Sequence, residues 1–145
     1  LVAGIGGERP GCARWLAHFE RLLFHSKGVA LPDHLQSATG LLLEAIRLDP
    51  LDRRARQGLV ERRASYLEYT LHELPAGVLH GHNGATVAEC EELVKDLADF
   101  REHVAFLGET ERFVDLIGEC ELHFNRYREY LMAGRPGGSY ERFLR

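Results

Sequence analysis

The sequence is poor in cysteine, with three thiols in 145 residues and no CxxC pair among them. It therefore predicts neither a disulfide framework nor a thiolate zinc site. Long hydrophobic runs are also missing, since no apolar stretch approaches the roughly 20 residues that cross a bilayer. The opening segment LVAGIGGERPGC has no apolar core of a signal peptide. We therefore expect a cytoplasmic chain, or a cytosolic domain of a larger protein, without membrane insertion.

An excess of basic charge is missing too. The chain has 18 Lys and Arg against 22 Asp and Glu, a net charge of −4, which argues against a nucleic-acid partner. The charge is unevenly spread, because residues 86–124 hold eleven acidic and three basic residues, whereas 125–145 hold five basic and two acidic. We interpret the acidic segment as a solvated helix face, with a docking site for a basic partner as the alternative.

Catalytic and cofactor motifs are likewise absent from the sequence. It has no GxSxG elbow, and its glycine clusters GIGG and GRPGGS lack the Lys-Ser/Thr ending of a phosphate loop. We therefore expect a protein that is not an enzyme and binds no cofactor.

Apolar residues at spacings of three and four are abundant, and no segment alternates with a period of two, so the sequence predicts an all-α helical bundle. We expect five main helices and a short C-terminal helix at about 139–144. Pro75 should end the third main helix, and Thr86 with Glu89 forms the pattern of a capping box. The predicted N-caps of the second to fifth helices are Asp33, Asp52, Thr86 and Thr110.

The spacing also predicts which side chains face the core. The predicted stripe of the first helix, which should end at Lys27, is Cys12, Trp15, Leu16, Phe19, Leu22 and Leu23. The predicted stripe of the fifth helix is Phe113, Leu116, Ile117, Cys120, Phe124, Tyr127 and Leu131. Tyr130 falls beside that stripe, so we expect it to be exposed.

One helical hairpin resembles a known repeat. Ahead of Pro50, small and large apolar residues stand at the offsets of a tetratricopeptide repeat, at Leu22, Ala38, Leu42, Ala45 and Leu48, and EAIRLDP is its most typical piece. His25-Ser26 and Val60 depart from the Leu-Gly pairs of that family, so the resemblance covers about residues 22–60. It implies a helical scaffold that holds a segment of another protein in a groove.

The predicted organisation is a flexible start at 1–10, one all-helical domain at 11–133, and a turn with the short helix at 134–145. Within the domain, 11–74 are tetratricopeptide-like helices, 75–85 a loop, and 86–133 a helical hairpin. Because the first residue is Leu, we expect this chain to be a fragment of a larger protein.

The resulting functional hypothesis is a non-catalytic protein-interaction or scaffold module. Arg53, Arg56 and Arg63 are candidate contacts to an acidic partner segment, and Tyr130, near Arg126 and Arg128, is a candidate contact of the type enriched at binding surfaces.

Two alternatives stay open. Acid-x-x-x-His pairs place a carboxylate and an imidazole on one helix face, which could bind a metal ion or a small ligand. These pairs are Glu68/His72, Asp99/His103 and Glu119/His123. His80 and His82 in the loop are a further pair. The other alternative is a self-association domain, a homodimer held by the acidic and basic faces.

Overall fold

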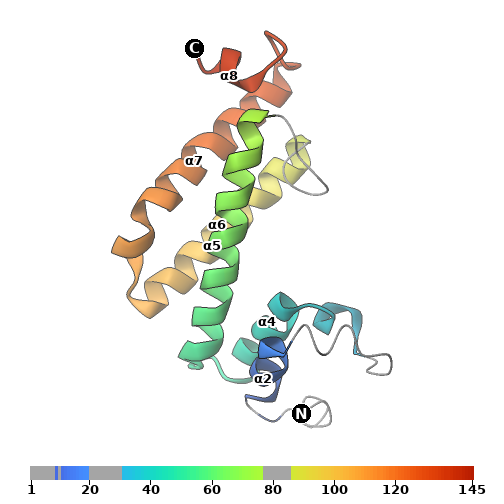
Figure 1. The fold of residues 1–145 in the computed structure, drawn as a ribbon, viewed down its shortest axis with the longest axis vertical. Coiled ribbons are helices and arrows are strands. Elements are labelled where there is room, and N and C mark those ends of the chain that lie inside the picture. Colours follow the sequence, from blue (N-terminus) through green and yellow to red (C-terminus); the bar gives the residue numbers. More distant parts are fainter. Residues whose placement is uncertain (1–8, 10, 20–30, 77–85) are drawn as a thin grey trace. The chain divides into compact units, whose positions relative to one another are not determined.

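A computed structural model describes residues 9, 11–19, 31–76 and 86–145. This part of the chain is about 80% helical, with six α-helices and no strand, which confirms the predicted all-α fold. The elements are α2 (Cys12–His18), the 3₁₀ turn η1 (Asp33–Leu35), α4 (Ala38–Leu48), α5 (Arg53–Ala76), α6 (Val87–Leu107), α7 (Thr110–Met132) and α8 (Tyr140–Phe143) (Figure 1). None of these helices is long and apolar enough to cross a membrane.

The chain divides into two compact units, 1–62 and 63–145, with the boundary inside α5. The apolar pattern of the sequence predicts a single domain over 11–133. Several sequence predictions lie outside the described residues: the flexible start before Arg9, the Leu22 and Leu23 end of the first helix, and the loop with His80 and His82.

The first unit is built on the packing of α2 against α4. Its buried face of α2 consists of Ala13, Leu16 and Ala17, whereas Trp15 and Phe19 are exposed. The predicted stripe of the first helix is therefore wrong at Trp15 and Phe19. The reason is that Ala13, Leu16 and Ala17 form a second apolar face at spacings i, i+3 and i+4. The small side chains of its two alanines let α2 and α4 approach closely.

The observed caps differ from the predicted ones at two of four helices. Ser37 caps α4, where its hydroxyl accepts a hydrogen bond from the Gly40 N–H at 3.0 Å, while the predicted cap, Asp33, starts η1. Thr110 is the first residue of α7, and the N-cap position is Glu109, without a side-chain cap. Gly108, at φ 77°, ends α6 only one residue before Glu109, so this tight connection leaves Thr110 inside the next helix.

The other two predicted caps are confirmed. Asp52 accepts from the Ala55 N–H at 3.0 Å, and Thr86 forms the complete capping box with Glu89. The third main helix ends two residues later than its predicted end at 74, since α5 includes Pro75 and stops at Ala76.

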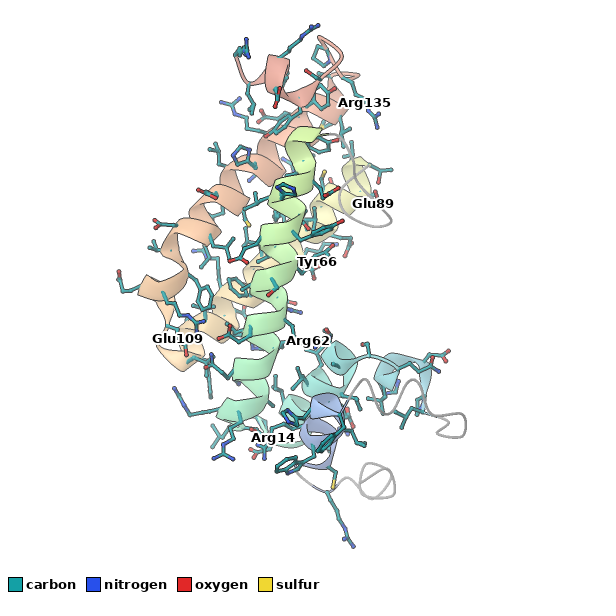
Figure 2. The ribbon with its side chains drawn as sticks, viewed as in Figure 1. Arg14, Arg62, Tyr66, Glu89, Glu109 and Arg135 are labelled. Carbon is teal, nitrogen blue, oxygen red and sulfur yellow. The ribbon has the colours of Figure 1, made fainter. Side chains whose placement is uncertain are left out.

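The second unit contains the hairpin of α6 and α7, whose side chains are drawn in Figure 2. The aromatic rings of Phe100 on α6 and Phe113 on α7 meet edge to face, with centroids 5.3 Å apart. The buried residues of α6 recur at spacings of three and four, namely Cys90, Leu93, Leu97, Phe100, Val104 and Leu107. The buried residues of α7 are Phe113, Cys120, Phe124, Tyr127 and Tyr130.

The prediction that Tyr130 is exposed is wrong, because the residue is only 4% exposed. Its ring centroid lies 5.6 Å from that of Tyr127, 5.8 Å from that of Tyr140 and 5.5 Å from that of Phe143. The last two belong to the segment that starts at Ser139, the N-cap of α8. The short C-terminal helix thus covers the neighbouring face of α7, which the stripe of α7 alone could not reveal.

Candidate functional site

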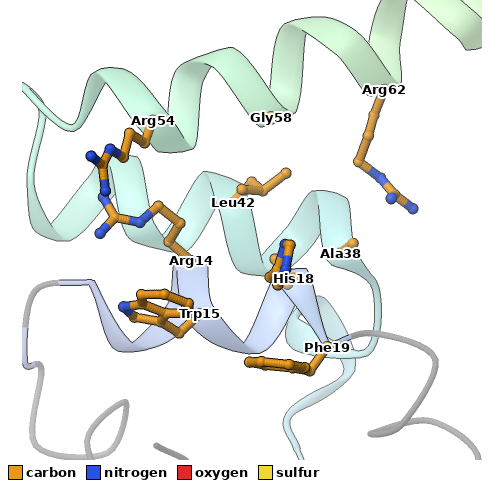
Figure 3. A pocket seen from close by; sticks show the side chains of 10 residues that line it. Arg14, Trp15, His18, Phe19, Ala38, Leu42, Arg54, Gly58 and Arg62 are labelled. Carbon is orange, nitrogen blue, oxygen red and sulfur yellow. The ribbon is translucent and has the colours of Figure 1, made fainter.

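A pocket of about 640 Å³ lies within the first unit, between α2, α4 and the start of α5 (Figure 3). Its lining combines aromatic, aliphatic and cationic groups. The lining residues are Arg14, Trp15, Ala17, His18, Phe19, Ala38, Leu42, Arg54, Gly58 and Arg62. No acidic side chain is among these lining residues, so the pocket has a positive character.

One wall of the pocket is an aromatic cluster on α2. The rings of Trp15 and Phe19 are stacked, at 17° with centroids 6.5 Å apart, and His18 meets Phe19 edge to face at 5.2 Å. Trp15 is 49% exposed and Phe19 is 41% exposed. Because α2 buries its alanine-containing face, its bulky rings remain available at the surface of the pocket.

The floor of the pocket is aliphatic and depends on a close approach of α4 and α5. A Cβ atom placed on Gly58 would lie 3.3 Å from Cδ2 of Leu42. Any side chain at Gly58 would therefore press on Leu42, and the glycine keeps the floor open. Ala38, one turn before Leu42 on α4, adds a small side chain to the same lining.

Three arginines supply the charge of the pocket. In Figure 3, Arg14 and Arg54 extend toward one end of the pocket and Arg62 lies at the other, with Leu42 between them. The Nη1 atom of Arg14 lies 2.6 Å from both carboxylate oxygens of Asp52, so its charge is largely compensated. Arg54 and Arg62 are exposed, and they are the cations best placed to meet a ligand.

The Arg14–Asp52 pair also fixes the geometry of the pocket. Burial by itself raises the pKa of Asp52. The hydrogen bond from the Ala55 N–H and the Arg14 guanidinium outweigh burial, so the pKa of this carboxyl is lowered. Asp52 therefore joins α2 to the N-terminus of α5 as an ionised group.

The predicted contact arginines lie on α5 outside the pocket lining. Arg53 is exposed in the first turn, beside Arg54. Arg56 donates to the Pro50 carbonyl, with its Nη2 at 2.9 Å. Arg63 belongs to the second unit, where its Nη2 lies 3.7 Å from a carboxylate oxygen of Asp99 and its side chain is 16% exposed.

The three acid–histidine pairs lie on three different helices, α5, α6 and α7, and they do not converge. In the part of the chain that the structure describes, no three His, Cys, Asp or Glu side chains are placed to hold a metal ion. The described structure thus does not bring His72, His103 and His123 together at one point. A spacing of four places each pair on one face of its own helix, but it does not aim the faces of three helices at one point.

Each of the three histidines has surroundings of its own. His72 is exposed on α5, and His103 is half-buried on α6. The Nδ1 atom of His123 lies 3.1 Å from the Tyr140 hydroxyl, which ties this histidine to the packing of α8. The acidic members of the pairs are all exposed, namely Glu68, Asp99 and Glu119.

None of the ten lining residues was identified as a contact from the sequence, including Trp15, Phe19, Arg54 and Arg62. For Trp15 and Phe19 the sequence did contain a signal, because α2 has two apolar faces that could be buried. The face with the bulky rings is exposed only if the alanine-containing face is buried. Comparison of the chain with models of protein families, with curated proteins and with solved structures finds no match.

Proposed function

We propose that the chain is a protein-interaction module whose first unit holds a segment of a partner protein in this pocket. The observation that carries the proposal is the exposed Trp15 and Phe19 stack, set beside exposed arginines. Tryptophan, tyrosine and arginine are the residues that most often dominate binding energy at protein interfaces. The resemblance of residues 22–60 to a tetratricopeptide repeat supports the same reading, since α4 and the start of α5 belong to that region.

The chemistry of the lining specifies an acidic segment that also carries a large apolar side chain. Arginine binds carboxylates through parallel N–H groups, which fixes orientation as well as charge. Exposed ion pairs contribute about 0–1 kcal/mol each, so Arg54 and Arg62 would select the partner and set its orientation. The Trp15–Phe19 stack and Leu42 would supply most of the affinity by removing apolar surface from water.

Function and context follow as part of the same proposal. The module has a non-catalytic role, and we place it in the cytoplasm. Its contribution there would be to hold a partner, so loss of the module should impair assembly of a complex and should not change a catalytic rate.

The pocket supplies its own reporter, because Trp15 is the single tryptophan of the chain. We would titrate the whole chain with tryptophan-free peptides that combine Glu, Asp and Leu, and follow Trp15 emission. We expect a saturable change that weakens as salt screens the arginines. Matched peptides with Lys in place of the acids should give none.

The variant Arg54→Ala/Arg62→Ala should weaken this response by about three- to tenfold, while Arg53→Ala, one residue away and outside the lining, should not. Circular dichroism on each variant checks that the helices are retained. An unchanged Trp15 signal with every acidic peptide would contradict the proposal, and so would equal binding by the double variant.

A further inference from the structure

The outward face of α7 carries apolar side chains that the described fold leaves uncovered. Val114 is 52% exposed and Leu122 is 56% exposed, two turns apart on one face of the helix. Gly118 lies between them, and a Cβ atom there would meet nothing within 4 Å. Glycine in a helix interior costs about 1 kcal/mol relative to alanine. Packing inside the second unit does not require glycine at position 118. A partner that approaches the helix closely at this position would require it.

Carboxylates flank this apolar ridge. Glu111 and Asp115 are exposed on the same side of α7 as Gly118 and Leu122, at spacings of four and three residues. They belong to residues 86–124, where eleven acidic residues stand against three basic ones. The face therefore combines acidic and large apolar side chains, which is the chemistry that the pocket of the first unit selects.

We propose that the pocket of one copy binds the outward face of α7 of a second copy. This inference rests on the proposed function and names its partner. Leu122 or Val114 would enter between the Trp15–Phe19 stack and Leu42, while Arg54 and Arg62 meet Glu111 and Asp115. Charge complementarity favours this contact over α7 against α7, because the latter would bring like-charged carboxylates together.

The contact joins two different surfaces, the pocket of one copy and the α7 face of another, and every copy carries both. Two copies can form a closed dimer, in which each pocket binds the α7 face of the other copy. Otherwise the same contact repeats from copy to copy and forms an open chain. Both outcomes raise the mass above that of the monomer, and both weaken with salt, because arginine and carboxylate charges at a surface are screened.

Sedimentation of the whole chain tests this directly. At about 0.05 M ionic strength we expect species larger than the monomer, with a shift toward monomer at about 0.5 M. Arg54→Glu/Arg62→Glu alone and Glu111→Arg/Asp115→Arg alone should both sediment as monomers, since each places like charges at the contact. An equimolar mixture of the two variants should associate again, because reversed pockets then face reversed helices.

Two control variants each reverse a single charge outside the proposed contact. Arg53→Glu lies beside the pocket, and Glu102→Arg lies on α6; both should associate like the unchanged chain. A monomeric unchanged chain overturns the inference, as do association in either single-surface variant, failure of the folded mixture to associate, and equal loss in the controls.

The two proposals fail separately. If the chain is monomeric yet Trp15 still responds to acidic peptides, the proposed function stands and only the second copy is excluded as its partner. If peptides leave Trp15 emission unchanged in the monomeric Glu111→Arg/Asp115→Arg variant, whose pocket lining is unchanged, the proposed function fails, and this inference, which rests on it, fails with it.

Discussion

One nitrogen of the Arg14 guanidinium lies 2.6 Å from both carboxylate oxygens of Asp52, although 38 residues separate the two in the chain. Asp52 is 7% exposed, and the same carboxylate caps α5 through the Ala55 N–H. A single side chain thus fixes where α5 begins and how α2 lies against it. Because α2 carries Trp15 and Phe19, the shape of the pocket depends on a residue that does not line it.

Removing the Asp52 side chain should therefore cost more than removing a cap alone. Asp52→Ala loses a cap, about 1 kcal/mol, and leaves Arg14 without its carboxylate, so we expect roughly 2–4 kcal/mol less stability in urea unfolding. Asp52→Asn keeps a cap acceptor and should lose about half of that. Asp33→Ala, at an exposed carboxylate that caps no α-helix, serves as control and should stay within about 0.5 kcal/mol. Equal losses in the Ala and Asn variants would show that the cap contributes nothing and that only the ion pair with Arg14 matters.

The lowered pKa of Asp52 predicts the pH at which this contribution disappears. A carboxyl whose pKa is lower in the folded than in the unfolded state stabilises the fold above the unfolded pKa, about 3.9. That stability is lost as the pH falls through the lower, folded pKa. In urea unfolding as a function of pH, Asp52→Asn should show a shallower loss below about pH 4 than the unchanged chain. Parallel curves for the two proteins would argue against an ionised Asp52 in the fold.

Local signals in the sequence predicted the helices well. Some features depend only on residues close together in the sequence, so the sequence alone predicts them. These are the capping box at Thr86, the Asp52 cap and the buried stripe of α6. Two outcomes depended on residues distant in the chain. Tyr130 is covered by Tyr140 and Phe143 of α8, and the face that α2 buries is decided by α4. The pocket was missed for this second reason, since its aromatic wall is the face of α2 that α4 leaves uncovered.

Two helical glycines should respond oppositely to alanine. At Gly40 an added Cβ would lie 1.8 Å from the His34 carbonyl oxygen, which is backbone and cannot move aside, so Gly40→Ala should destabilise by more than about 2 kcal/mol. At Gly118 the added atom meets nothing, so Gly118→Ala should stabilise by about 0.5–1 kcal/mol. Chemical denaturation of both variants measures this contrast. Destabilisation by Gly118→Ala would indicate that the backbone there is not a regular helix.

Tyr140 should hold α8 on α7. It is 2% exposed, its ring meets that of Tyr127 edge to face at 5.0 Å, and its hydroxyl donates to the His123 carbonyl oxygen at 3.3 Å. We expect Tyr140→Ala to cost about 3–5 kcal/mol and Tyr140→Phe about 1 kcal/mol, because only the hydroxyl contacts are lost. Tyr69→Phe makes the same chemical change at an exposed site and should stay within about 0.5 kcal/mol. Matching losses for the two Phe variants would contradict a role for the Tyr140 hydroxyl.

The thiols of the second unit should be inert while the protein is folded. Burial, reinforced by Glu89, raises the pKa of Cys90 to about 11, and burial with Glu119 raises that of Cys120 to about 12. Only the thiolate attacks an alkylating reagent, so at about pH 8 both thiols are protonated as well as enclosed. Cys12 is half-buried in the first unit. Mass spectrometry after iodoacetamide should find one adduct, on Cys12, in the native protein and three adducts in urea.

The same labelling reads out the opening of the second unit, because Cys90 on α6 and Cys120 on α7 react only when the hairpin opens. Tyr140→Ala should accelerate the modification of both thiols by at least about tenfold, as expected when opening becomes more than about 1.4 kcal/mol easier. Tyr69→Phe should leave both rates unchanged. Native modification of Cys120 as fast as that of Cys12 would mean that the α6–α7 core is open to solvent. Acceleration of Cys90 alone in Tyr140→Ala would mean that the end of α6 opens separately from the middle of α7.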